Sequence, residues 1–105
     1  MVEISFDHYH GYDETTEILH EFTEEYPGLT ELHSIGKSTE GRDLWLIEIT
    51  NKETGPPEDK PAVYVDGNTH AAEVTGWEVC LWLIRRVLEN VLCLWVGAGR
   101  PIAGA

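Results

Sequence analysis

The sequence predicts an α/β fold in which helices pack on a sheet, and three patterns support this prediction. Near the amino terminus, apolar residues recur at the spacing of one helix face, namely Ile18, Leu19, Phe22 and Tyr26. Two segments with strand composition follow, Leu29–Lys37 and Asp43–Asn51. A third apolar run, Pro61–Val65, leads into a long apolar helix. We therefore expect about three strands and two helices in the 105 residues, a length within the range of one domain.

The first helix is expected to begin at Asp13, a typical N-cap residue, and to run to about Tyr26. Pro27 and Gly28 come next and end it, because proline lacks an amide proton and glycine favours turns. Glutamates cover the side opposite the apolar stripe, so we expect a structural role for this helix.

The two strands that follow are joined by Ser38-Thr39-Glu40-Gly41-Arg42, in which Gly41 offers the positive φ that such a connection commonly needs. The second strand is apolar at consecutive positions, from Leu44 to Ile47. Such a pattern is typical of a strand that is covered on both faces. Residues 52–60 contain a glycine and two prolines and are expected to form a loop.

The segment Asp66-Gly67-Asn68-Thr69-His70-Ala71-Ala72-Glu73 lies between the predicted strand Pro61–Val65 and a helix expected from Ala71 to about Asn90. Side chains three apart on a helix share a face, so His70 and Glu73 can reach one point. An imidazole nitrogen and a carboxylate oxygen are typical zinc ligands. The carboxyl end of a strand is also where α/β sheets place ligand sites. His70 and Glu73 are therefore candidate metal ligands, with a purely structural role as the alternative.

The helix that follows is apolar nearly all round and needs cover on nearly all sides. Three strands and two helices provide too little cover, so we expect an exposed apolar helix that can self-associate. From residue 91 to 105 the composition changes, because this tail contains no acidic residue. We interpret it as an atypical apolar tail, either a fraying continuation of the helix or the product of a truncation or frameshift.

The net charge of −12, from nineteen acidic and seven basic residues, argues against binding to nucleic acid or to an anionic membrane surface. A solvated acidic surface is the simpler interpretation, and adaptation to a high-salt cytoplasm is a hypothesis. Met1-Val2-Glu3 has no signal-peptide character, which favours a cytoplasmic location. Charged residues interrupt the longest apolar region, so a transmembrane helix is not expected.

Two further features bear on metal and redox chemistry. Cys80 and Cys93 form neither a disulfide framework nor a Cys-x-x-Cys motif, and Cys80 is expected to be a buried, inert thiol. His8 and His10 alternate, so both point to one side if the segment is extended. They are either an independent metal pair or part of a mobile amino-terminal arm.

Three stretches of the chain together resemble the amino-terminal portion of the zinc carboxypeptidases, the metallocarboxypeptidases of peptidase family M14. They are Tyr9–Glu14 before the first helix, Gly36-Lys37-Ser38-Thr39-Glu40-Gly41-Arg42 in the hairpin, and Asp66–Glu73. The resemblance implies a doubly wound mixed-sheet domain of the phosphorylase/hydrolase-like kind, of which residues 1–90 are the amino-terminal part.

The resemblance also implies a function, the zinc-dependent removal of carboxy-terminal residues from peptides. His70 and Glu73 correspond to the first two of three zinc ligands, whereas the family's third ligand and general-base glutamate lie further along. We therefore expect a fragment with Zn²⁺ ligands but no catalytic residue of its own, inactive alone. Ala72 stands where digestive members have an arginine, which leaves the substrate open. The alternatives are a zinc-dependent deacylase of the same superfamily and a non-catalytic remnant or interaction module.

Overall fold

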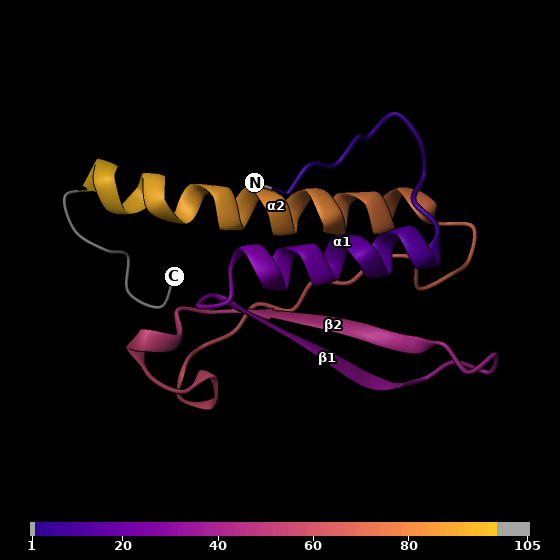
Figure 1. Cartoon of the computed structure of the whole chain (residues 1–105). Coiled ribbons are helices and arrows are strands. Elements are labelled where there is room, and N and C mark those ends of the chain that lie inside the picture. The colour runs from indigo at the N-terminus through magenta and orange to yellow at the C-terminus, as the bar shows by residue number, and fades with distance from the viewer. Residues whose placement is uncertain (1, 99–105) are drawn as a thin grey trace.

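The computed structural model describes residues 2–98, and for residues 91–98 it describes the backbone alone. The elements in chain order are α1 (Tyr12–Glu25), β1 (Thr30–Lys37), β2 (Asp43–Ile49), the short 3₁₀ helices η1 (Lys52–Thr54) and η2 (Pro57–Asp59), and α2 (Val74–Ala98). The two helices lie on one side of the β1–β2 hairpin, with α1 between α2 and the strands (Figure 1). The predicted α/β class is confirmed.

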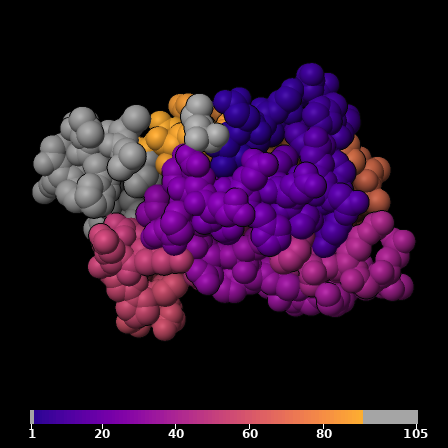
Figure 2. Space-filling model, viewed as in Figure 1, coloured from indigo at the N-terminus to yellow at the C-terminus, as the bar shows by residue number. Residues whose placement is uncertain are grey.

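The hydrophobic core lies where α1 meets α2. Phe22 of α1 and Leu88 of α2 are its largest fully buried side chains. Leu32, Ile47 and Ile49 of the hairpin pack against this core at its edge. The amino-terminal segment and α1 cover much of α2 when the molecule is viewed from the side of α1 (Figure 2). The helix pair, rather than the sheet, therefore contributes most of the buried apolar surface among the described residues.

The first helix begins two residues earlier than predicted, because its N-cap is Gly11 and not Asp13. Gly11, in an extended conformation, is the N-cap, and its carbonyl oxygen accepts the first helical hydrogen bond from the Thr15 amide at 2.9 Å. Asp13 is therefore not the N-cap, and it lies in the first turn, where its negative charge suits the helix dipole. The helix ends at Glu25, as predicted to within a residue, and Tyr26 is its C-cap.

The two strands of the hairpin were predicted with nearly the right bounds. They pair antiparallel, with Leu32 opposite Ile47 and Ser34 opposite Trp45. Gly41 has the expected positive φ, 83°, in the connection between them. The predicted cover on both faces of β2 is absent from the described part of the chain, because the helices lie on one side only and Leu44 is exposed (Figure 1).

The predicted strand Pro61–Val65 is wrong. These residues form no strand, and the Val63 side chain is 91% exposed. Each of the two described strands pairs with the other alone, so the segment lacks the backbone partner that a strand requires. An apolar composition favours a buried strand but cannot supply that partner.

The second helix begins at Val74, three residues after the predicted start, and continues past Asn90 to Ala98. Its backbone therefore crosses the boundary that was predicted at residue 90 without a break. The remainder of the predicted tail, residues 99–105, lies outside the described residues. Among the described helices, none has the length and apolar content needed to cross a membrane.

Candidate metal centre

His70 and Glu73 lie in the turn that immediately precedes α2. The prediction that both stand on one face of a helix is therefore wrong, because the helix begins only at Val74. The Glu73 amide donates to the His70 carbonyl oxygen at 2.9 Å. In the other direction, the His70 amide donates to Oε1 of Glu73 at 3.3 Å. The two residues are therefore brought together by one turn, in which the Glu73 carboxylate also satisfies a backbone donor. Both side chains are exposed.

The turn is held by its own polar groups. Asn68 has a left-handed backbone, with φ 62°. With its amide nitrogen turned towards the turn, Asn68 donates to the carbonyl oxygens of His70 and Glu73, each at 3.2 Å. Asparagine tolerates this conformation better than most residues, because its short polar side chain bonds locally. Asn68 is therefore a positioning residue that the sequence analysis did not single out.

A close backbone approach fixes the turn against α2. A Cβ atom on Gly67 would stand 2.4 Å from the Gly76 carbonyl oxygen in the first turn of α2 and 3.1 Å from Sγ of Cys80. Only glycine leaves room for this approach. Gly76 is less tightly enclosed, since a Cβ there would stand 3.3 Å from the backbone nitrogen of Asn68. In the sequence, the one indication of this contact was the presence of glycine at both positions, 67 and 76.

Carboxylates shape the electrostatics beside the turn. Burial raises the pKa of the Cys80 thiol, and the nearby Asp66 carboxylate raises it further. A hydrogen bond to Asp66 likewise raises the pKa of the exposed Tyr64 hydroxyl. Asp66 therefore adds a negative charge next to the turn, which is a favourable setting for a cation.

The donor set of the turn fits zinc in its chemistry, because it offers one imidazole and one carboxylate with access to solvent. Within the described residues, no third histidine, cysteine, aspartate or glutamate joins these two in a metal-sized group. Among residues 2–90, the structure therefore places no third candidate ligand beside His70 and Glu73.

A different set of potential ligands does come together at the amino-terminal end of α1. One ligand atom each from His8, His10 and Glu14 lies within 4.8 Å of the others. The alternation of His8 and His10 in the sequence predicted the two histidines as a pair, without Glu14. Glu14 could have been included from the sequence, because it lies four residues after His10 and in the first turn of the helix.

Comparison with known proteins agrees with the family resemblance. A family model described as zinc carboxypeptidase matches residues 15–92, which include the hairpin and the His70–Glu73 turn. Human carboxypeptidase D is 40% identical over 87 residues, covering 79% of this chain and 6% of that protein. The zinc carboxypeptidase of Saccharothrix mutabilis subsp. capreolus is 36% identical over 82 residues, covering 78% of this chain and 19% of the relative. Mouse carboxypeptidase A6 is 33% identical over 88 residues, covering 84% of this chain and 19% of that protein.

The chain spans between 6% and 19% of the length of these curated relatives. The family match nevertheless extends over well more than half of the chain, from within α1 through the His70–Glu73 turn into α2. The chain therefore belongs to the zinc carboxypeptidase family, peptidase family M14.

Proposed function

We propose that His70 and Glu73 are two zinc ligands of a metallocarboxypeptidase-type site that removes carboxy-terminal residues from peptides. The observation that carries this proposal is the position of the His70–Glu73 turn, which lies inside the region matched by the zinc carboxypeptidase model. The same two residues are the ones that the family motif assigns as its first two ligands.

Bound zinc supplies a Lewis acid for a carbonyl oxygen and lowers the pKa of a coordinated water. The residues of this chain hold and orient that ion. Asn68 and Gly67 fix the turn that carries both the His70 imidazole and the Glu73 carboxylate. The pair is open to solvent, so further ligands, substrate or water can reach the ion.

The chain alone is expected to lack peptidase activity. Among its described residues, no third ligand completes the metal group at the turn. A two-ligand site holds zinc more weakly than a full one, and the ion stays exchangeable. An assay of the 105-residue chain with zinc should therefore give no release of carboxy-terminal residues from peptides and none of acyl groups from N-acyl amino acids. Turnover of the N-acyl substrate would favour the deacylase alternative.

The zinc-ligand role is tested by titrating the ¹⁵N-labelled full chain with Zn²⁺ and following its amide resonances. We expect the signals of His70, Glu73 and Gly76 to shift in the wild type. In His70→Ala and Glu73→Gln these shifts should be lost or need at least tenfold more zinc. His33→Gln is the matched control, because His33 also lies near a carboxylate, Glu48, at 3.8 Å. Unchanged shifts at the turn in His70→Ala would remove this residue as a ligand.

We also propose a non-catalytic property, self-association through α2. Val79, Trp82 and Val87 of this helix are exposed, and the Trp82 side chain is 47% exposed. Large exposed apolar side chains on one helix favour association with a second copy. Light scattering across a range of protein concentrations should show dimers or larger species, and Trp82→Lys should shift the chain towards monomer. A wild-type monomer at all concentrations would contradict this property.

A further inference from the structure

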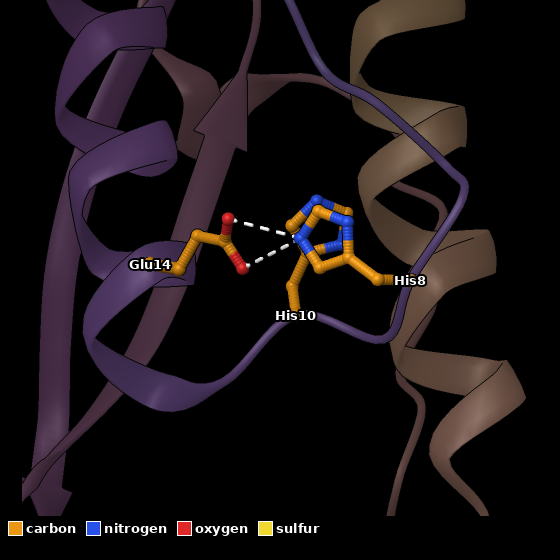
Figure 3. A group of neighbouring side chains, drawn as sticks. All are labelled: His8, His10 and Glu14. Carbon is orange, nitrogen blue, oxygen red and sulfur yellow. Dashed lines mark hydrogen bonds and ion pairs between the residues drawn. The ribbon is translucent and has the colours of Figure 1, made fainter.

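We propose that His8, His10 and Glu14 form a second divalent-metal site of the zinc type at the start of α1, separate from the His70–Glu73 turn. The three ligands come from seven consecutive residues, so the local chain brings them together without help from distant segments. His8 and His10 lie on the segment before the N-cap Gly11, and Glu14 lies in the first turn of α1. Figure 3 shows both imidazole rings beside the Glu14 carboxylate, and their planes are inclined by 43°.

The distances between the candidate ligand atoms are close to those between ligands of one metal ion. Both oxygens of Glu14 stand 3.1 Å from Nε2 of His8. Two ligands that are each about 2 Å from zinc at a tetrahedral angle are about 3.3 Å apart, so this pair already has a suitable separation. The His8 and His10 ring centroids are 4.5 Å apart. Since all three ligand atoms lie within 4.8 Å, small side-chain rotations complete the group.

Each histidine has a carboxylate beside its Nδ1 atom, Asp7 for His8 and Glu78 for His10. Nδ1 of His8 is 2.7 Å from the Asp7 carboxylate, which leaves Nε2 directed at Glu14. Nδ1 of His10 is 2.5 Å from Glu78 of α2, and Glu78 also accepts a hydrogen bond from the His10 amide at 2.9 Å. When Nδ1–H donates to a carboxylate, Nε2 carries the free lone pair that binds a metal. Carboxylate–histidine–metal chains of this kind set the tautomer and raise the basicity of the ligand.

The burial of these groups suits a metal site that is anchored on one side and open on the other. The His10 side chain is 2% exposed and Glu78 is 14% exposed, so this ligand is fixed against α2. His8 and Glu14 are each about half exposed, which gives an ion a path from solvent. A metal binds the neutral imidazole of His8, so a proton held on Nε2 between the ring and Glu14 is released to water when the metal binds.

The surroundings favour a small cation. The ligands border a cleft of about 200 Å³, which is smaller than a typical organic-ligand pocket. The same cleft is lined by three further carboxylates, those of Glu3, Glu17 and Glu21. With this many acidic groups around two imidazoles, a divalent ion reduces the repulsion between carboxylates. Imidazole with carboxylate is a ligand set that suits zinc and related transition ions.

The experiment separates this site from the turn before α2 by using the full chain with His70→Ala and Glu73→Gln as background. In that background, calorimetric titration with Zn²⁺ should still give one equivalent of binding. Co²⁺ should give a visible ligand-field spectrum from coordinated nitrogen and oxygen. Adding His8→Gln or Glu14→Gln should weaken zinc binding at least tenfold, and circular dichroism should show that the exposed substitutions leave the fold intact.

Further variants distinguish a metal site from a purely structural hydrogen-bond network. Glu78→Gln keeps a hydrogen-bond acceptor for His10 but removes the charge, and we expect a 10- to 100-fold loss of zinc affinity. His20→Gln, on the exposed side of α1, should leave the affinity unchanged. The proposal is overturned if the background chain binds no zinc, or if His8→Gln and Glu14→Gln alter thermal stability but not zinc affinity.

Discussion

At the scale of single residues, Gly67 determines how closely the His70–Glu73 turn approaches α2. A methyl group at this position would collide with the Gly76 carbonyl oxygen at 2.4 Å. That atom belongs to a helix backbone and cannot move aside without distorting the first turn of α2. The position of His70 and Glu73 therefore depends on a residue that has no chemistry of its own.

Gly67→Ala should consequently displace the turn. We expect it to destabilise the chain by about 1–3 kcal/mol, the usual cost of overpacking, and to weaken zinc binding at His70 and Glu73. Gly28→Ala is the matched control, because a Cβ there meets nothing within 4 Å. Urea unfolding and the zinc-induced amide shifts measure the two effects. Wild-type values for both in Gly67→Ala would show that the turn tolerates a side chain.

The Cys80 thiol provides a second prediction at this scale. Burial and the neighbouring Asp66 carboxylate raise the pKa of this thiol. A raised pKa means less thiolate at neutral pH, and the thiolate is the reactive form. Alkylation by iodoacetamide, followed by mass spectrometry of the Cys80 peptide, should be slower than for a free cysteine at pH 7. It should accelerate as the pH rises beyond the ordinary cysteine range.

Asp66→Asn isolates the charge contribution to this reactivity. It removes the smaller of the two causes and should increase the alkylation rate modestly, while burial continues to slow the reaction. Alkylation of the wild type at the rate of free cysteine at pH 7 would contradict a raised pKa.

At the scale of elements, α1 is joined to its two neighbours by a pair of adjacent threonines. Thr15 accepts a hydrogen bond from the Trp77 indole of α2 at 2.8 Å. Thr16 accepts one from the Trp45 indole of β2 at 3.0 Å. Consecutive residues of a helix point about 100° apart, so Thr15 can face α2 while Thr16 faces the hairpin.

Thr15→Val should loosen the contact between α1 and α2. Thr15 is 6% exposed, and valine keeps its shape while leaving the Trp77 N–H without an acceptor. The expected loss is about 1–3 kcal/mol of unfolding free energy, measured by urea denaturation. Thr23→Val is the control, because among the described residues the Thr23 hydroxyl bonds to the His20 carbonyl oxygen of its own helix and to no other element. Equal effects of the two variants would show that the indole contact adds nothing to stability.

The sequence predicts elements well where their bonds are local and poorly where the partner is distant. The hairpin was found because Gly41 and the strand patterns on either side are enough to specify it. Pro61–Val65 was misassigned because a strand needs a backbone partner that composition does not reveal. The ligand turn was misplaced by a few residues because Asn68, Gly67 and Gly76 stabilise a turn where helical periodicity favours an early helix start.

The same distinction applies to the candidate sites. His70 and Glu73 could be identified from a motif, because their proximity depends on four consecutive residues. The connection of His10 to Glu78 joins residues 68 positions apart, so no local pattern predicts it. That connection argues against the mobile arm, one of the two alternatives given for this segment, because it holds the segment against α2. Arg85 of α2 adds a hydrogen bond to the Ile4 carbonyl oxygen at 3.2 Å.

At the scale of the whole molecule, the net charge of −12 opposes folding through repulsion between carboxylates. The exposed side of α1 concentrates this charge, because Glu17 and Glu21 stand four residues apart. Like charges at this spacing destabilise a helix. Glu24 adds to the effect near the carboxyl end of α1, where the last turn carries no basic residue and the helix dipole disfavours an acid.

Salt should therefore stabilise this chain. The Debye length falls from about 10 Å at 0.1 M to about 3 Å at 1 M, so most repulsion between exposed carboxylates is screened in molar NaCl. We expect Tm, followed by circular dichroism, to rise continuously over this range. The triple variant Glu17→Gln, Glu21→Gln and Glu24→Gln should melt higher than the wild type at low salt and respond less to added NaCl. This comparison separates screening from the general strengthening of apolar contacts by salt, which acts on both proteins alike. A Tm that is flat with salt, or parallel slopes for the two proteins, would show that charge repulsion does not limit the stability of the fold.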